Sequence, residues 1–319
     1  MTNFSLKQLR YFEALARHGH FRHAADACAI SQPALSMQIK DLEEMLGTAL
    51  FDRGARQVRL TSFGEEFGLR VRDILRSVDE LEDLARAARD RLVGRLRIGV
   101  IPTVAPYMLP AIIASLNDAY PGLDIHVRET VTQTLISELA EGRLDTAIVA
   151  LPVSEPSLTE VALFEENFVL VRSRADEDKP VPGSEALRDM RLLLLEEGHC
   201  FRHQALSFCN FQASRPRELL DGSSLSTLVQ MVGAGIGVTL IPEMAVPIET
   251  RSADVSIARF KRPEPSRTIG LIWRKTNPLA SELREIADRL ATICDDPSTP
   301  ASGVDRGGET VTDTPAGPP

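Results

Sequence analysis

The chain has 319 residues, of which 43% are hydrophobic and 25% are charged, a composition typical of soluble globular proteins with two or three domains. No uninterrupted apolar stretch is long enough to cross a bilayer, and the amphipathic start "MTNFSLKQLRYFEALARHGHF" lacks the apolar core of a secretory signal. We therefore expect a cytoplasmic protein without a membrane partner. Four cysteines in so long a chain exclude a disulfide framework as the basis of the fold.

The charge is distributed unevenly along the chain, whose net charge at pH 7 is −9. Residues 1–62 carry eight Lys and Arg against six Asp and Glu, a net +2, so the remaining 28 basic and 39 acidic residues give −11. This asymmetry suits a small module that faces DNA, joined to an acidic partner domain.

Three helices are predicted before residue 47. The first covers residues 5–17, with Ser5 as its N-cap and apolar residues at helical spacing. A short second helix covers residues 22–28, and "SQPALSMQIKDLEEML" forms a third that is capped by Ser31. The tight corner "CAIS" joins the second and third helices into a helix-turn-helix.

The third helix has a polar face of the kind that can contact DNA. Its apolar stripe consists of Leu35, Ile39, Leu42 and Leu46. That stripe leaves Gln32, Ser36 and Lys40 facing outward near the N-terminal half. Amides and hydroxyls in such positions can hydrogen-bond to base edges in a major groove.

A wing and a long helix are predicted next. "LFDRGARQVRLTSFG" reads as two short strands around a turn at Gly54, with Arg53, Arg56 and Arg59 available to phosphates or a minor groove. Ser62, with Glu65 three residues later, predicts a capping box that opens a helix to about residue 91. Its apolar stripe consists of Phe67, Val71, Ile74, Leu75, Val78, Leu81 and Leu84. We expect this stripe to pack against a second copy of the chain.

The segment from "LRYFEALARHGHF" through "SQPALS" to "VRLTSFG" resembles the winged helix-turn-helix of LysR-type transcriptional regulators over roughly the first 90 residues. The resemblance implies binding of promoter double-stranded DNA as a homodimer or homotetramer, with RNA polymerase as a further partner. It assigns DNA contact to Gln32, Pro33, Ser36 and Arg53.

The rest of the chain alternates strand and helix patterns. "RLRIGVIP", "LDIHVRE" and "LDTAIVAL" predict strands, with helices over residues 104–119 and 132–142 between them, hence a parallel sheet. "FVLVRS", "RLLLLEE", a helix over residues 225–233 and "GVTLIP" predict a second such set. "TIGLIWR" and a closing helix over residues 278–294 return to the first half. Two lobes of this kind resemble the periplasmic-binding-protein-like effector domain of the same family.

The expected fold class is therefore multidomain: an α-helical winged helix-turn-helix plus a two-lobed α/β effector domain. We place the DNA-binding domain at residues 1–62, the linker and dimerisation helix at 63–92, and the effector domain at 93–294. Residues 295–319 are rich in Pro, Gly, Ser, Thr and Asp and predict a disordered tail.

The segment "GHCFRHQALSFC" places Cys200 and Cys209 nine residues apart. It resembles the redox segment of the hydrogen-peroxide sensors of the LysR-type family, and the resemblance continues through "IGVIPTVAPYMLP", "ETVTQTLI", "TLIPEMAVP" and "RTIGLIWR". It implies that peroxide oxidises Cys200 to a sulfenic acid and that Cys209 resolves it as a disulfide. The implied function is an activator that controls antioxidant-defence genes. One departure is His203, where related sensors commonly carry an acidic residue.

The chemistry of a thiol that reacts with peroxide fits this segment. An ordinary thiol, with a pKa of about 8.5, is mostly protonated at neutral pH, so nearby positive charge or donors are needed. The sequence offers His199 and Arg202, and the resemblance adds Thr103, Thr132 and Arg267 as groups that hold or activate peroxide. If the segment were helical, about 13 to 14 Å would separate the two Cα atoms, whereas a disulfide needs about 4.4 to 6.8 Å. Oxidation would then rebuild the segment.

Other interpretations of the same residues remain open. The two thiols could be unrelated packing residues, as we expect for Cys28 and Cys294, or could bind a metal together with His199 and His203. The effector could instead be an organic anion bound between the lobes by Thr103 and Thr132. A thiol peroxidase would use the same cysteines, but the DNA-binding half argues against an enzyme. We expect neither a metal nor a cofactor.

Overall fold

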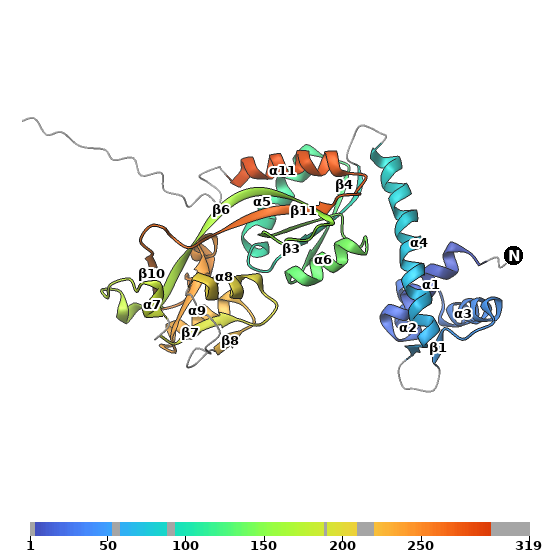
Figure 1. Ribbon diagram of the computed structural model, residues 1–319, viewed down its shortest axis with the longest axis horizontal. Coiled ribbons are helices and arrows are strands. Elements are labelled where there is room, and N and C mark those ends of the chain that lie inside the picture. The colour runs from blue at the N-terminus through green and yellow to red at the C-terminus, as the bar shows by residue number, and fades with distance from the viewer. Residues whose placement is uncertain (1–3, 53–57, 88–92, 188–189, 209–219, 295–319) are drawn as a thin grey trace, which may run out of the picture. The chain divides into compact units, whose positions relative to one another are not determined.

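The computed structural model describes residues 4–52, 58–87, 93–187, 190–208 and 220–294 (Figure 1). The predicted tail, the wing turn with Arg53, the segment with Cys209 and the side chain of Cys294 lie outside the described residues. Contacts divide the chain into a first compact unit with residues 1–91 and a second with most of residues 92–319. Within the described ranges, no helix is both long and apolar enough to cross a membrane.

The first unit begins with three short helices: α1 (Leu6–His18), α2 (Phe21–Ala27) and α3 (Gln32–Leu46). Ser5 caps α1 as the sequence predicts, because its hydroxyl accepts from Gln8 N at 3.2 Å and Gln8 Oε1 accepts from Ser5 N at 2.9 Å. One apolar core joins the three helices through the buried side chains Leu9, Phe12, Leu15, Ala24, Leu35, Ile39 and Leu42. The helix-turn-helix is therefore confirmed.

The wing and the long helix complete this unit. Strands β1 (Phe51–Asp52) and β2 (Arg59–Leu60) pair antiparallel, as predicted. Helix α4 (Ser62–Ala87) follows, but the predicted cap at Ser62 is wrong. Ser62 is already helical, so the preceding hydroxyl caps the first turn: Thr61 Oγ1 accepts from Gly64 N at 3.0 Å.

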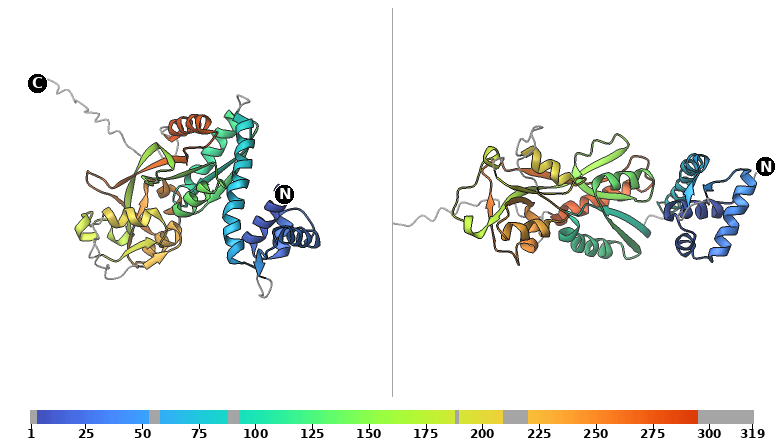
Figure 2. Two further views of the ribbon diagram at one scale, coloured as in Figure 1. Left: turned by 45° about the vertical axis from the view of Figure 1, so that its right-hand side comes forward. Right: turned by 90° about the horizontal axis from the view of Figure 1, so that it is seen from below.

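The apolar stripe of α4 is divided between two uses. Val71 and Leu75 are buried in the core of the first unit, and Phe67 packs against that core. Ile74 and Leu81 are 42% and 64% exposed. In Figure 2 the cyan α4 extends well past the blue helices that cover its first half. The prediction that the whole stripe faces a second copy is therefore wrong for Val71 and Leu75, because the first unit itself needs them to close its core.

The second unit is built on one nine-stranded sheet with the order β4-β3-β5-β11-β6-β9-β7-β8, and β10 also pairs with β6. Its first lobe starts with the predicted parallel strands β3 (Gly94–Val100), β4 (Leu123–Glu129) and β5 (Thr146–Leu151). Helices α5 (Ala105–Ala119) and α6 (Thr132–Ala140) connect them. The βαβαβ prediction is confirmed.

Two long strands join the lobes (Figure 1). Strand β6 (Leu158–Ser173) pairs through its first part with β11 (Ser266–Arg274), antiparallel. Its last part pairs with β9 (Val238–Pro242) and β10 (Val255–Arg259) in the second lobe. The sequence predicted only residues 168–173 of β6 as a strand, so the continuous strand through both lobes is a correction. The return of β11 to the first lobe is confirmed, since it also pairs with β5.

The second lobe adds the parallel strands β7 (Leu192–Leu195) and β8 (Leu220–Gly222) to β9. Its helices are α7 (Ser184–Leu187), α8 (Cys200–Phe208), α9 (Leu225–Gly233) and α10 (Val246–Glu249), with single 3₁₀ turns η1 (Arg174–Asp176) and η2 (Glu243–Ala245). The closing helix α11 (Ala280–Cys294) packs against β6.

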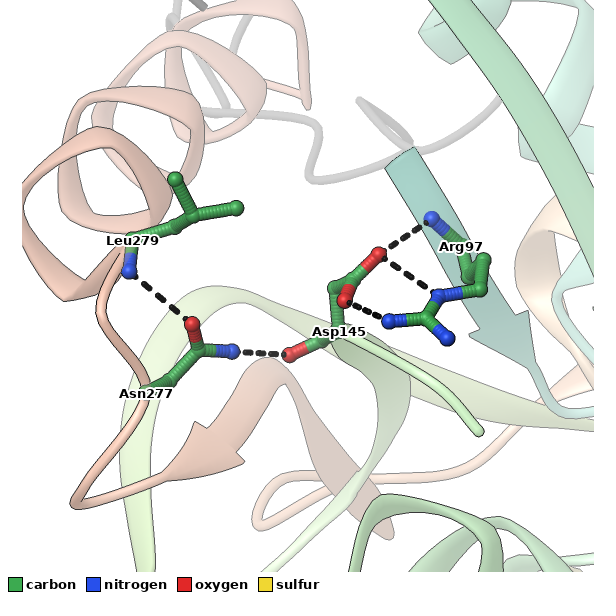
Figure 3. Close-up of polar contacts among 4 residues, drawn as sticks. All are labelled: Arg97, Asp145, Asn277 and Leu279. Carbon is green, nitrogen blue, oxygen red and sulfur yellow. Dashed lines mark hydrogen bonds and ion pairs between the residues drawn. The ribbon is translucent and has the colours of Figure 1, made fainter. Parts of the chain in front are cut away.

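Asp145 links the first lobe to the start of the closing helix, through its carboxylate on one side and its backbone carbonyl on the other (Figure 3). Asp145 is fully buried and accepts from Arg97 N and Arg97 Nη2, both at 2.7 Å. Asn277 Nδ2 donates to Asp145 O at 2.9 Å, and Asn277 Oδ1 accepts from Leu279 N just before α11. These hydrogen bonds connect β3, the residue before β5 and the start of α11.

Candidate redox site and DNA-binding helix

Cys200 is the first residue of α8, which follows the buried strand β7. Gly198 makes the turn between them with φ +99°, a left-handed conformation that side chains rarely adopt. Cys200 is a half-buried free thiol. Because α8 is nine residues long, the positive end of its helix dipole lies at this thiol.

The thiol segment lies beside the start of α6 in the other lobe. A Cβ atom placed on Gly198 would lie 3.9 Å from Val131 Cγ1. The next residue, Thr132, opens α6 and is only 8% exposed. Among the described residues its hydroxyl oxygen has no hydrogen-bond partner. A buried hydroxyl in that state is suited to bind a small polar molecule.

Thr103 and Arg267 are brought into direct contact. Arg267 Nη1 donates to Thr103 Oγ1 at 2.8 Å, and Nη2 donates to Thr103 O at 3.0 Å. The guanidinium also pairs with Glu166, whose Oε2 accepts from Nε at 2.8 Å. All three side chains are buried.

An aromatic pair connects this cluster to the thiol segment. The Arg267 guanidinium lies 5.5 Å from the ring centre of Phe201, the residue after Cys200, and 6.0 Å from that of Phe168. The two phenylalanine rings meet edge to face with their centres 4.9 Å apart. The structure thus brings together the thiol segment, Arg267 and Thr103, and Thr132 follows Val131, which lies beside Gly198.

Arg202 is engaged elsewhere. Its Nη1 donates to Leu195 O at 2.7 Å and pairs with the carboxylate of Asp221. These bonds tie the first turn of α8 to β7 and β8. His203, on the same helix, is exposed.

His199 precedes the thiol and is half-buried. Burial lowers its pKa, and the negative charge of Glu196 opposes part of that shift. The imidazole is therefore neutral at pH 7, where it can donate or accept a hydrogen bond but supplies no full positive charge.

Helix α8 keeps the end of the segment away from Cys200. The helical rise from Cys200 to Phe208 is about 12 Å, and Phe208 packs edge to face on Phe260 with ring centres 5.0 Å apart. Cys209 follows directly but lies outside the described residues.

Two residues near the thiol were missed from the sequence. Glu166 was missed because the strand was started at Phe168, although the strand alternation places Glu166 on the face of the buried Phe168. Gln204 lies one helical turn after Cys200, and its Oε1 is buried without a hydrogen-bond partner among the described residues. The only sequence signal for Gln204 was its position, four residues after Cys200, which puts a polar side chain on the same side of a helix as the thiol.

Cys28, in the first unit, has a different environment. Cys28 packs against the core of the first unit, and burial raises the pKa of its thiol. In the described part of the chain, no three His, Cys, Asp or Glu residues are grouped so as to hold a metal ion.

Helix α3 carries the predicted DNA-contacting residues other than Arg53. Gln32 and Pro33 are exposed in its first turn, and Ser36 is half-buried one turn later. Lys40 is exposed and pairs with Glu44 at 3.3 Å. Ser31 caps the helix by accepting from Ala34 N at 3.4 Å.

Two family models match this arrangement of a helix-turn-helix and a two-lobed domain. The bacterial regulatory helix-turn-helix protein model of the lysR family matches residues 6–65, and the LysR substrate binding domain model matches residues 89–295. The chain belongs to the LysR family of bacterial regulatory helix-turn-helix proteins.

Relatives extend the match to nearly the whole chain. A probable hydrogen peroxide-inducible genes activator of Streptomyces viridosporus is 44% identical over 293 residues, which cover 90% of this chain and 93% of the relative. The DNA-binding transcriptional dual regulator OxyR of Escherichia coli is 40% identical over 297 residues, covering 91% and 96%.

Solved structures are similar over the same length. A full-length cysteine-to-aspartate variant of OxyR from Pseudomonas aeruginosa has a TM-score of 0.70 at 34% identity, covering 90% of this chain and 95% of that chain. A hydrogen-peroxide-bound cysteine-to-serine mutant of OxyR from Corynebacterium glutamicum has a TM-score of 0.61 at 34% identity, covering 91% and 92%. The predicted fold class is confirmed.

Proposed function

We propose that this protein is a transcriptional regulator that senses hydrogen peroxide through Cys200. The observation that carries the proposal is the position of this thiol at the start of α8. Val131 lies beside Gly198 of the same segment, and the buried hydroxyl of the next residue, Thr132, has no hydrogen-bond partner among the described residues. The guanidinium of Arg267, which donates to Thr103, lies over the ring of Phe201. The names of the relatives, peroxide-inducible activators and OxyR, support the same signal.

In the proposed reaction the Cys200 thiolate attacks one peroxide oxygen. The S–O bond forms as the O–O bond breaks, so sulfur is oxidised by two electrons and the departing hydroxide takes a proton from solvent to become water. Thr103 and Thr132 would hold the peroxide oxygens, and Arg267 would stabilise the charge on the leaving oxygen. His199 would act as a neutral hydrogen-bonding group. Arg202 would contribute indirectly, because it holds the first turn of α8 against β7 and β8.

The resolving step would give the switch its mechanical effect. The thiolate of Cys209 attacks the sulfenic sulfur, hydroxide leaves and is protonated, and a Cys200–Cys209 disulfide forms. With α8 formed, Phe208, the residue before Cys209, lies about 12 Å along the helix from Cys200. A disulfide permits only about 4.4 to 6.8 Å between the Cα atoms of its two cysteines. We therefore propose that oxidation unwinds α8 and displaces Phe208 from Phe260.

The output of the switch would be altered binding to promoter DNA. Gln32, Pro33, Ser36 and Arg53 would contact the operator, and the exposed part of α4 would join two copies in a homodimer that can assemble into a homotetramer. The DNA-binding domain would end at residue 62, the linker helix at residue 92 and the effector domain at residue 294. RNA polymerase would be the partner at activated antioxidant-defence promoters. This role implies a cytoplasmic location and no enzymatic turnover.

The proposal is tested by footprinting before and after peroxide, on operators selected from random duplexes with the reduced protein. We expect one equivalent of hydrogen peroxide to change the wild-type footprint and a dithiol to restore it. Cys200→Ser should keep its reduced footprint throughout, whereas the control Cys28→Ser should respond as the wild type does. A wild-type footprint that ignores peroxide but changes with small organic anions would favour an anion effector bound by Thr103 and Thr132.

A further inference from the structure

Glu166 has no part in the mechanism proposed above, yet it is a fully buried carboxylate within the same cluster. The register of β6 and β11 places it directly opposite Arg267. The exposed fractions of the two side chains are 2% and 0%, and Arg267 Nη2 lies 2.7 Å from Glu166 Oε2. A buried charge pair of this kind gives little net stability, because removing both charges from water is costly.

The pair is held in one orientation by its remaining hydrogen bonds. Glu166 Oε2 accepts from Arg267 Nε at 2.8 Å, and its Oε1 accepts from Met244 N of η2 at 3.1 Å. Arg267 has five N–H donors, of which Nη1 and Nη2 each supply one to Thr103, at 2.8 and 3.0 Å. Three of the five donors are thus hydrogen-bonded to Glu166 or Thr103, and Nη2 is also in ion-pair contact with Glu166, so the guanidinium plane cannot turn without breaking several contacts.

This arrangement determines whether the Thr103 hydroxyl can donate a hydrogen bond to a further group. Its oxygen accepts from Arg267 Nη1, so its own hydrogen points away from the guanidinium and is available to donate to another group. A peroxide O–O bond breaks more easily when a fixed donor meets the oxygen that leaves, because that oxygen gains negative charge.

We propose that Glu166 is a positioning residue for the peroxide reaction: it holds Arg267 so that the Thr103 hydroxyl is fixed as a donor. This inference rests on the proposed function. A carboxylate is required because both of its oxygens accept, whereas a glutamine would turn an N–H group either toward the guanidinium or toward Met244 N. Burial raises the pKa of Glu166, while Arg267 and Met244 N oppose that shift.

The test compares two reactions of the same thiol in the full chain. With Cys28, Cys209 and Cys294 replaced by Ser, sulfenic acid at Cys200 is followed after mixing with hydrogen peroxide, and alkylation at Cys200 is followed with iodoacetamide. We expect Glu166→Gln to slow the peroxide reaction by about 10- to 100-fold, since a misplaced donor is lost from the transition state. Alkylation, which has no O–O bond to cleave, should change by less than about threefold. Equal slowing of both reactions, or of neither, would overturn the inference.

Two further variants show whether Glu166 acts through Arg267. Adding Glu166→Gln to Arg267→Met should slow the peroxide reaction no further than Arg267→Met alone. The matched control is Glu243→Gln, which removes another partly buried carboxylate, paired with Arg259 and adjacent to Met244. It should leave both rates unchanged. An additive loss in the double variant would contradict a role through Arg267.

A second pair of variants replaces Glu166→Gln if that variant does not fold. Thr103→Val removes the hydroxyl but keeps the Glu166–Arg267 pair, and should show the same selective loss, which Thr103→Ser should restore. Selective loss in neither variant would overturn the inference. In the wild-type chain, which retains Cys28, a Cys200 that does not react faster with peroxide than Cys28 would mean that the proposed function fails. If Cys200 does react faster and Glu166→Gln does not slow its reaction, only the positioning role fails.

Discussion

Arg202 and Asp221 pair between the first turn of α8 and the edge strand β8, and Arg202 also donates to Leu195 O of β7 at 2.7 Å. Both contacts depend on α8 starting at Cys200. In the proposed switch, closure of a Cys200–Cys209 bond unwinds α8, so the pair should stabilise the reduced form only.

Weakening this anchor should therefore favour the oxidised form. In Asp221→Asn we expect the disulfide potential to become more negative by about 20 mV, which corresponds to about 1 kcal/mol for a half-exposed ion pair. Equilibration with glutathione buffers measures the potential. Glu177→Gln, which breaks the exposed pair with Arg174, is the control and should leave it unchanged. A potential that becomes more positive in Asp221→Asn would mean that the anchor survives oxidation.

Operator binding should depend on the first turns of α3. Gln32→Ala and Ser36→Ala should each weaken specific binding by about 1 to 3 kcal/mol, because they remove polar groups from the outward face. Arg53→Ala should weaken binding to all DNA sequences and reduce the slope of the logarithm of the binding constant against the logarithm of salt concentration by about 1. Fluorescence anisotropy across a salt series measures both effects. Unchanged affinity in all three variants would remove this face from the DNA interface.

Assembly should depend on the exposed part of α4. Leu81 is 64% exposed, so Leu81→Asp should leave the monomer folded and yet release it from the dimer, where a charge would be buried against the second copy. Val78→Asp should act in the same way. Sedimentation velocity gives the oligomeric state, and circular dichroism checks the fold. Mutants that remain fully oligomeric would place the dimer contact elsewhere.

Stability should fall on the acid side because of His199. Burial lowers its folded-state pKa, so the unfolded chain takes up this proton first, starting near pH 6.5. The contribution of the neutral imidazole is complete above about pH 6.5 and is lost as pH falls through the lower folded-state value. His199→Gln should therefore flatten the fall of the urea midpoint between about pH 7.5 and pH 5. Parallel curves for the two proteins would contradict the assignment.

Local sequence signals predicted most of the fold. The Ser5–Gln8 capping box, the cap at Ser31 and the alternation of strands and helices mark elements that adopt their structure for local reasons. The continuous strand β6 was beyond such signals, since residues 158–167 are partly exposed and have no strong apolar pattern. Their strand form comes from pairing with β11, more than a hundred residues away in the chain.

The candidate site was predictable to a similar extent. The cysteines and the residues around them lie in one short segment, and Thr103, Thr132 and Arg267 were proposed through the family resemblance. Glu166 became apparent only from the register of β6 on β11, because a buried ion pair across strands leaves no local pattern. The engagement of Arg202 by Asp221 likewise depends on a contact 19 residues away.

The central claim, that peroxide joins Cys200 to Cys209, is tested most directly by peptide mapping after brief exposure to peroxide. Wild type, Cys28→Ser and Cys294→Ser should all yield the Cys200–Cys209 disulfide. Cys200→Ser should yield no oxidation in this segment, and Cys209→Ser should yield a sulfenic acid at Cys200 that a dimedone reagent traps. A disulfide from Cys200 to Cys28 or Cys294, or a thiol at Cys200 that stays reduced in the wild type, would contradict the account.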